Sequence, residues 1–248
     1  MLGYAEASAS FSSFDVSSPS PSPASASASS DGSSSAGDSS SAGDSSSAEA
    51  SAAGASSAAG DSSAAGVGVD TQEEALAGQL AARLAAARRV RWTVLARTGL
   101  DTRELAALLA DAPPGAHDVA VVCTGVNDVT GRCEPAAFVE RLERVLQVLR
   151  QRHGVRLTVL SPVPPMHRFP ALPQPLRAYL GWRARALDAA LRAQAARWPG
   201  CALLPAPLPV TPGAIASDGF HPSAQTYRAW AEAAASVIGQ RAGDLAPP

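Results

Sequence analysis

Strand-like and helix-like segments alternate along most of this chain, and that alternation narrows the possible folds more than any other feature. Apolar residues recur every four positions at Leu76, Leu80 and Leu84, as on the buried face of a helix. Residues 90–96 follow in an alternating, strand-like pattern. Residues 118–123 form a near-continuous apolar run, typical of a parallel strand covered on both faces. We therefore predict a right-handed series of parallel strands and crossover helices in a three-layer α/β/α domain.

The other elements continue in the same order. Helices are predicted at residues 70–87, 101–110, 135–153, 176–198 and 222–238, and further strands at residues 155–161 and 201–205. Asp70 or Thr71 is expected to cap the first helix. In α/β folds the functional residues collect on loops at the carboxyl ends of the strands. Gly99, Asn127 and the loop before Pro222 lie at such ends, so we expect a site at this edge of the sheet.

The first quarter of the chain has a different composition. Residues 1–57 are mostly Ser, Ala, Gly and Pro, in which Phe11 and Phe14 are isolated exceptions. So few aromatic and branched side chains cannot offset the entropy of ordering the backbone. The sequence therefore predicts a disordered low-complexity tail over residues 1–57, one domain over residues 58–240, and a flexible C-terminus over residues 241–248.

Charge, cysteine content and hydropathy argue against several classes of protein. After residue 57 the chain has twenty basic residues, all arginines, against sixteen acids, a balance that does not favour a nucleic-acid-binding surface. Cys123, Cys133 and Cys201 have neither metal-ligand spacing nor an even disulfide framework, so we predict no metal site and buried thiols. The chain shows no secretory signal and no run of 18 apolar residues. A cytoplasmic protein with no integral membrane segment is the expectation.

Ser62 is the candidate nucleophile, at the point where the low-complexity run ends. The triplet Gly-Asp-Ser also begins at Gly37 and Gly43, so the triplet alone carries no information. Only the copy at Gly60 is followed by a Gly-Val-Gly turn and a helix. A serine hydroxyl is a poor nucleophile, so the hypothesis requires a base, an orienting acid and oxyanion donors further along the chain.

His221 is the candidate base. Asp218 precedes it by three residues, on a turn that Gly219 tightens and Pro222 ends. This spacing lets the carboxylate reach one imidazole nitrogen and leaves the other free for a serine hydroxyl. A histidine taken alone is more often a surface or core residue, so the assignment depends on these neighbours.

Gly99 and Asn127 are candidate oxyanion donors. A glycine after a strand exposes its backbone N–H, and an asparagine amide donates two hydrogen bonds. The alternative is ordinary turn chemistry, in which Asn127 and Asp128 cap a helix. For Asn127, directly after a buried strand, both interpretations stay open.

Taken together, these motifs resemble the four sequence blocks of the SGNH hydrolases, also called GDSL-type esterases and lipases. The matching blocks are Gly60-Asp61-Ser62 with Gly66 and Gly68, then Gly99, then Gly125-Val126-Asn127-Asp128, then Asp218-Gly219-Phe220-His221-Pro222. The resemblance implies that Ser62 is the nucleophile, His221 the general base and acid, and Asp218 the residue that orients His221. The N–H groups of Ser62 and Gly99 and the side-chain amide of Asn127 would form the oxyanion hole.

The same resemblance implies a fold and a reaction. It implies a flavodoxin-like sheet of about five parallel strands, no metal or organic cofactor, and hydrolysis of a small acyl ester or thioester through an acyl-enzyme. One departure concerns residues 50–59, where the family has an aliphatic central strand and this chain has Ala, Ser and Gly. We therefore expect an atypical first strand and low stability or weak activity. A carbohydrate O-deacetylase, or an inactive protein whose tail mediates interactions, are the alternatives.

The proline-rich connection at residues 162–175 is a candidate wall of an acyl pocket. Met166, Phe169 and Leu172 supply its apolar side chains. The alternative is that these three side chains pack beneath a loop. His167 lacks an acid three residues before it, which favours His221 as the base.

Overall fold

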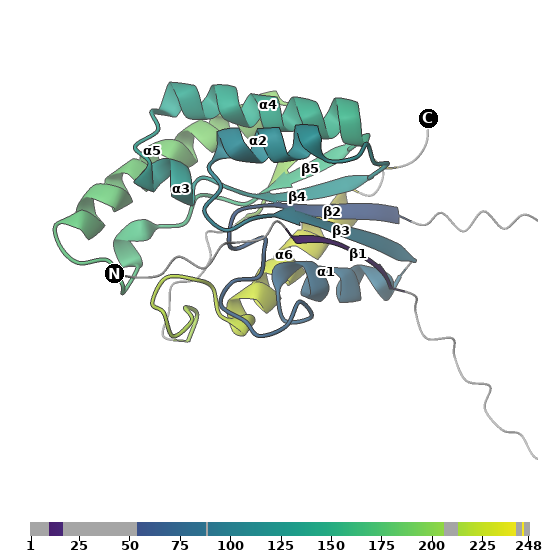
Figure 1. Ribbon diagram of the computed structural model, residues 1–248, viewed down its shortest axis with the longest axis horizontal. Coiled ribbons are helices and arrows are strands. Elements are labelled where there is room, and N and C mark those ends of the chain that lie inside the picture. Colours follow the sequence, from purple (N-terminus) through teal and green to yellow (C-terminus); the bar gives the residue numbers. More distant parts are fainter. Residues whose placement is uncertain (1–9, 17–53, 88, 206–212, 242–244, 246–248) are drawn as a thin grey trace, which may run out of the picture.

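One six-stranded sheet with helices on both faces forms the domain (Figure 1). The computed structural model describes residues 10–16, 54–87, 89–205, 213–241 and 245. The strands are β1 (Ser10–Val16), β2 (Gly54–Gly60), β3 (Val90–Ala96), β4 (Val119–Cys123), β5 (Leu157–Leu160) and β6 (Cys201–Leu203). The helices are α1 (Leu76–Ala85), α2 (Thr102–Asp111), α3 (Val126–Thr130), α4 (Pro135–His153), α5 (Leu176–Arg197), α6 (Ala224–Gln240) and the 3₁₀ helix η1 (Met166–Arg168).

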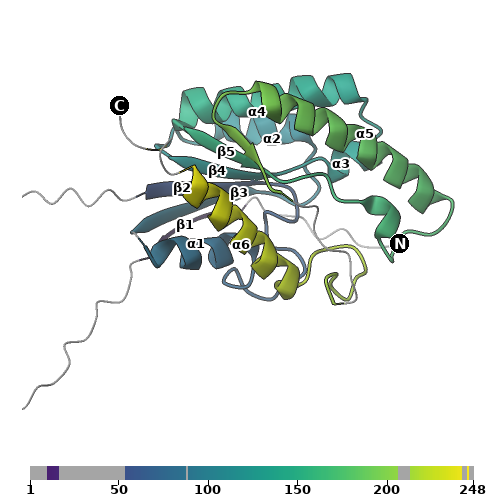
Figure 2. The same ribbon diagram turned by 180° about the vertical axis from the view of Figure 1, so that it is seen from behind.

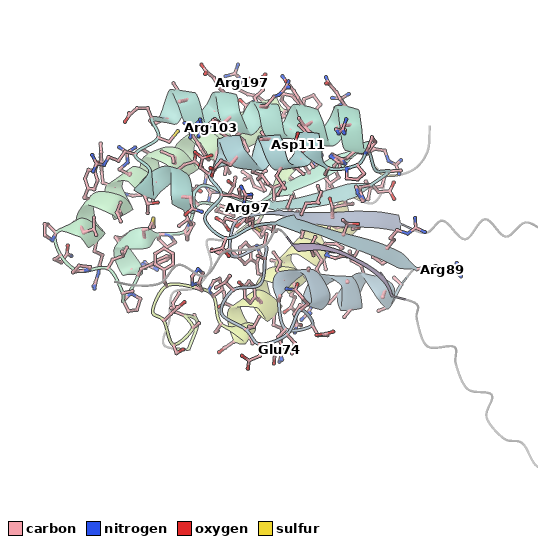
Figure 3. The ribbon with its side chains drawn as sticks, in the orientation of Figure 1. Glu74, Arg89, Arg97, Arg103, Asp111 and Arg197 are labelled. Atoms are coloured by element: carbon pink, nitrogen blue, oxygen red, sulfur yellow. The ribbon has the colours of Figure 1, made fainter. Side chains whose placement is uncertain are left out.

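The order of strands in the sheet is β1-β3-β2-β4-β5-β6, and β2 to β6 are all parallel. The predicted three-layer fold with five parallel strands is confirmed. Helices α2 and α4 cover one face, and α1 and α6 cover the other (Figures 1 and 2). Charged side chains such as Arg103, Asp111 and Arg197 lie on the outer surface of the helices, where water solvates them (Figure 3). None of the helices in the described residues is long and apolar enough to cross a bilayer.

Two apolar clusters, one on each side of the sheet, hold these layers together. On the α2 and α4 side, Phe138, Leu142 and Leu149 of α4 are almost fully buried, as the helical periodicity of the sequence predicts. On the other side, Leu76 and Leu80 of α1 lie in a cluster with side chains of α6. The sheet between them is buried on both faces, which is why β4 is apolar throughout.

The strand that carries the candidate nucleophile lies in the middle of the sheet. β2 pairs in parallel with β3 on one side and β4 on the other, and Ala58 and Ala59 are fully buried. One of its hydroxyls is poorly accommodated, since the buried Oγ of Ser57 has no hydrogen-bond partner. At Gly60 a Cβ would lie 2.0 Å from the carbonyl oxygen of Cys123, so only glycine permits this approach of β2 to β4.

Several expected boundaries are wrong. Within the supposed tail of residues 1–57, the structure contains β1 and the first residues of β2, so the domain does not start at residue 58. At the other end, Leu245 is buried beside α1 and α6 instead of lying in a flexible terminus. The remainder of both segments lies outside the described residues.

The first helix also starts later than expected. α1 begins at Leu76, and its N-cap is Ala75, which makes no side-chain cap hydrogen bond, so neither Asp70 nor Thr71 has the predicted role. α2 has a side-chain cap, because Asp101 and Glu104 form a reciprocal capping box.

β1 closes one edge of the sheet. It pairs antiparallel with β3, with Phe11 opposite Leu95 and Phe14 opposite Trp92. The backbone groups on that side of β3 are thereby hydrogen-bonded and do not form an open edge.

Candidate active site

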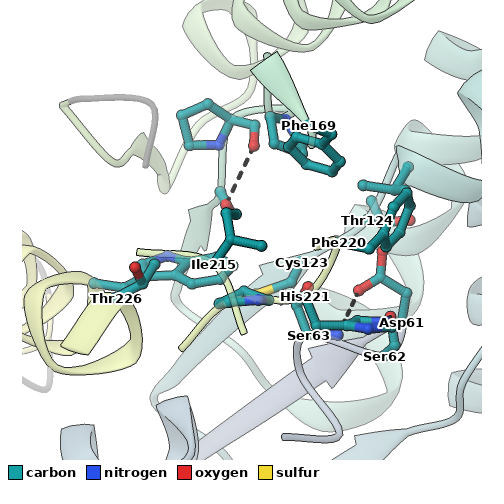
Figure 4. A pocket seen from close by; sticks show the side chains of 16 residues that line it. Asp61, Ser62, Ser63, Cys123, Thr124, Phe169, Ile215, Phe220, His221 and Thr226 are labelled. Atoms are coloured by element: carbon teal, nitrogen blue, oxygen red, sulfur yellow. Dashed lines mark hydrogen bonds between the residues drawn. The ribbon is translucent and has the colours of Figure 1, made fainter. Parts of the chain in front are cut away.

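Ser62, His221 and Asp218 lie in one hydrogen-bonded chain at the carboxyl edge of the sheet. Ser62 follows β2, and the other two come from the loop before α6. The Ser62 hydroxyl donates to Nε2 of His221 over 3.2 Å, and Nδ1 of the same ring donates to Oδ2 of Asp218 over 2.5 Å. Figure 4 shows His221 facing Ser62 across the site. Residues 159 positions apart in sequence are thus brought together as the sequence predicts.

The loop before α6 fixes the carboxylate of Asp218. Its Oδ1 accepts hydrogen bonds from the backbone N–H groups of Phe220 and His221, each 2.9 Å long. Burial would raise the pKa of Asp218, but the hydrogen bonds from the His221 ring and from these N–H groups hold the pKa below its ordinary value. Asp218 is therefore held as an anion beside the His221 ring at neutral pH.

Two glycines let the turn after β2 pack closely, Gly68 against the loop that carries His221 and Gly66 against the residue before α1. A Cβ on Gly68 would lie 2.4 Å from the carbonyl oxygen of Pro222, and Gly68 has φ +104°, which favours glycine. Gly66 is likewise close to Ala75. The hydroxyl of Tyr227 in α6 donates to the carbonyl of Val67 over 2.7 Å and anchors this turn. The turn that presents Ser62 is therefore held from the α6 side as well as by the sheet.

Asp61 lies beneath the same turn. Its side chain is almost fully buried, and its Oδ1 accepts a hydrogen bond from the N–H of Ser63 over 3.0 Å, the dashed line at the right of Figure 4. Burial raises the pKa of Asp61 to about 6. The sequence marks Asp61 only as part of a triplet, and its neighbours in the sequence do not indicate a buried carboxyl.

Gly99 lies in the loop after β3, and Asn127 lies in α3, which follows β4. The side-chain amide of Asn127 donates to the carbonyl of Leu100 over 2.9 Å, which links α3 to the loop after β3. The loop after β3 is in turn tied to β2, because the N–H of Arg97 donates to the carbonyl of Gly60 over 3.3 Å. Gly99 has φ +85°, and a Cβ at this position would meet no atom within 4 Å, so its backbone is open to a ligand.

Asp128 has a different role from that of its neighbour. It is buried, and its Oδ2 accepts from both the N–H and the hydroxyl of Thr102 at the start of α2. Its Oδ1 accepts from Arg141 of α4 over 2.9 Å. The alternative in which Asn127 and Asp128 cap their own helix is therefore wrong, since the N-cap of α3 is Gly125 with no side-chain cap hydrogen bond. Asp128 instead binds the first residue of α2, and the Asn127 side chain binds a loop carbonyl.

A small cavity of about 40 Å³ opens beside Ser62 and His221. Phe169 is part of its wall and packs edge-on against Phe220, with ring centroids 5.1 Å apart (Figure 4). Met166 is fully buried in the core and Leu172 packs against the same core, so these two follow the alternative interpretation.

Most of the other lining residues have no recognisable signal in the sequence. Thr124, Ser161, Thr226 and Trp230 contribute to this wall, and all four side chains are buried. They come from three elements or loops far apart in sequence. Only their positions at strand ends and on the inner face of α6 could have indicated them.

Comparisons with known proteins agree with this fold. A sequence model of the GDSL-like Lipase/Acylhydrolase family matches residues 58–229. A search of curated protein sequences found no match. A lipolytic G-D-S-L family protein from Veillonella parvula DSM 2008 has a similar structure, with TM-score 0.60 and 14% identity over 76% of this chain and 100% of that one.

Two further structures have the same fold. The lipase Lip_vut3 from a goat rumen metagenome gives TM-score 0.56 and 17% identity over 74% of this chain and 96% of that one. A carbohydrate esterase family 2 enzyme from Corynascus thermopiles gives TM-score 0.57 and 14% identity over 77% of this chain and 67% of that one. The family match covers most of the described domain and contains all the residues of the hydrogen-bonded chain. This protein therefore belongs to the GDSL-like lipase/acylhydrolase family.

Proposed function

We propose that this protein hydrolyses carboxylic esters or thioesters with Ser62 as its nucleophile. The observation that carries the proposal is the chain of hydrogen bonds from Ser62 through His221 to Asp218. His221 Nε2 takes the proton of Ser62 as Oγ attacks the carbonyl carbon of the ester. The imidazolium then gives that proton to the leaving oxygen, or sulfur in a thioester, and the acyl group stays on Ser62. Water, deprotonated by His221, releases the acid and restores the serine.

We assign three N–H donors to the oxyanion. They are the backbone N–H groups of Ser62 and Gly99 and the amide of Asn127. The bond from Asn127 to Leu100 uses one amide hydrogen, fixes the side chain and leaves the second hydrogen for the substrate. Fixed donors of this kind stabilise a developing oxyanion more than mobile water does.

The cavity supports a short acyl group. A volume of about 40 Å³ holds roughly three water molecules, so we expect an acetyl group to be the acyl group that it accommodates best. This size also favours the second candidate, a carbohydrate O-deacetylase, and one of the structural neighbours is a carbohydrate esterase.

The first experiment measures nitrophenyl-ester hydrolysis from acetate to laurate together with fluorophosphonate labelling. We expect labelling and a preference for short chains in the wild type, and neither labelling nor turnover in Ser62→Ala. Ser63→Ala is the matched control and should retain labelling. Label on the Ser62→Ala protein would remove the assignment.

A second assay separates the two candidates. Acetate release from acetylated sugars at a higher rate than from nitrophenyl acetate would favour the deacetylase. A folded wild-type protein that reacts with no fluorophosphonate would instead favour the inactive alternative.

A further inference from the structure

The largest exposed apolar side chains of the described residues lie together on the first two turns of α5. Leu176, Tyr179 and Trp182 are 44%, 43% and 59% exposed, whereas Leu180, one turn after Leu176, is buried. We call these three residues the aromatic face. The rings of Tyr179 and Trp182 are 6.4 Å apart, so the face is continuous. Water solvates such a cluster poorly, which marks it as a contact surface.

The aromatic face lies next to the candidate active site. Figures 1 and 2 both show the N-terminal end of α5 projecting past the carboxyl edge of the sheet. Arg177 in its first turn donates to the carbonyls of Pro170 and Leu172 over 3.1 and 2.5 Å. These residues directly follow Phe169, which lines the cavity. A surface bound at this end of α5 would therefore lie beside the cavity.

The surroundings of the aromatic face are positively charged. From η1 to Asp188 in α5 the chain carries Arg168, Arg177, Arg183 and Arg185 and no Asp or Glu in between. Arg168 and Arg185, which we call the basic rim, are exposed. Burial and then the charges of Arg185 and Arg168 hold the pKa of His167 below its ordinary value, which places these side chains close together. His167 in turn packs against Gly181, one position from Trp182.

Two acids on neighbouring parts of the chain, Glu134 and Asp188, already have arginine partners. Glu134 lies 3.5 Å from Arg183, and Asp188 lies 2.7 Å from Arg192. They do not offset the basic rim, so the aromatic face has a complementary charge for an anionic surface.

We propose that the aromatic face and the basic rim bind the surface of an anionic lipid layer. Trp and Tyr favour the lipid–water interface, an aliphatic side chain such as Leu176 enters the acyl region, and arginines attract anionic headgroups. A projecting helix end can reach a planar surface without a groove. A second part of the proposal rests on the proposed function: this contact delivers amphipathic esters to the site. Their short acyl group enters the cavity while the rest of the molecule stays in the lipid.

An acidic polysaccharide is the competing ligand, and the geometry disfavours it. The planes of Tyr179 and Trp182 are inclined by 35°, so they do not form one flat platform for sugar rings. The guanidinium of Arg183 also lies 5.9 Å from the Tyr179 ring centroid and covers that ring.

The test uses the full chain with Ser62→Ala, so that binding is measured without turnover and independently of the proposed chemistry. Vesicles of phosphatidylcholine, with and without phosphatidylglycerol, are sedimented with the protein. We expect binding to the anionic vesicles, a blue shift of tryptophan emission, and weakening by salt.

Variants locate the contact. Trp182→Ala should lower the partition coefficient about tenfold, and Trp182→Phe should restore most of it. Arg185→Gln should lower it about fivefold at low salt. Arg197→Gln, at the exposed far end of the same helix, is the matched control and should change little.

Three results would overturn the proposal. The first is no sedimentation with anionic vesicles. The second is binding that the combined Tyr179→Ala and Trp182→Ala substitutions leave unchanged. The third is binding to heparin that competes fully with vesicles and depends on Arg185 but not on Trp182, since this would identify an anionic polymer as the ligand.

Discussion

Two carboxyl groups near His221 have opposite environments. Asp61 is buried and accepts one hydrogen bond from Ser63, so its pKa is raised to about 6. Asp218 is 44% exposed and accepts three hydrogen bonds, and its pKa is lowered. This contrast separates their roles, because the residue that orients an imidazolium must stay charged, whereas a buried carboxyl is better suited to holding a turn.

The raised pKa of Asp61 predicts a pH-dependent stability. An unfolded Asp titrates near 3.8 and the folded one near 6, so between these values the folded state binds more protons. The free energy of unfolding should therefore fall as pH rises through this window, by about 3 kcal/mol, and the loss should be complete above pH 6. Asp61→Asn should flatten this dependence. Urea midpoints at several pH values check it, and equal slopes in both proteins would contradict it.

Asn127 offers a test of the oxyanion donors. Asn127→Ala should lower kcat for a short nitrophenyl ester about 100-fold with little change in KM, because the donor acts mainly in the transition state. It also removes the bond to Leu100, at a cost of about 1 kcal/mol that thermal unfolding reports separately. A kcat within about threefold of wild type would exclude Asn127 from the oxyanion hole.

At the scale of elements, β2 is a central strand built from small residues, in a position that aliphatic side chains usually occupy. Its backbone pairs on both sides, and Ala58 and Ala59 are buried between the helical layers. It contributes little apolar area, and the Ser57 hydroxyl is left without a partner. The low stability expected from the sequence stays a prediction, which a cooperative melt at an ordinary temperature would contradict.

Gly60 is a position of β2 that has no room for a side chain. Gly60→Ala puts a Cβ 2.0 Å from the Cys123 carbonyl at φ +155°, and should destabilise the fold by about 3 kcal/mol. Gly239→Ala is the matched control, since its Cβ meets nothing within 4 Å on α6, and it should be neutral or stabilising by up to about 1 kcal/mol. Denaturant unfolding of the two variants compares them.

The elements that sequence reasoning located well are those with a local signal. Pro135 begins α4 and Asp101 caps α2, because both positions have chemistry that acts within one turn. β1 was missed because its Ser-rich sequence forms a strand only beside β3, which is distant in the chain. The hydrogen-bonded chain of Ser62, His221 and Asp218 was predictable from spaced motifs. The cavity wall was not, since the sequence pattern around Trp230 is that of an ordinary core residue of α6.

At the scale of the whole molecule, the sheet is closed by a strand from outside the region that the family model matches. That region begins at residue 58, while β1 ends at Val16 and protects the edge of β3. The domain thus includes an N-terminal strand that lies beyond the matched region.

Truncation tests this contribution. A chain that begins at residue 17 should lose about 2 kcal/mol of stability, a fall of about 5 °C in Tm, and should self-associate through the open edge of β3. A chain that begins at residue 10 retains β1 and is the matched control. Melting and size-exclusion chromatography at several concentrations compare them, and identical behaviour would show that β1 contributes nothing.

The pairing of β1 also sets an order of events during synthesis. β1 leaves the ribosome before its partner β3, which begins at Val90, and β2 pairs with both β3 and β4. β1 and β2 can therefore complete their pairing only after sequence made later is available. A nascent chain that stalls before Val90 would present both strands without partners, to chaperones or to other copies of itself.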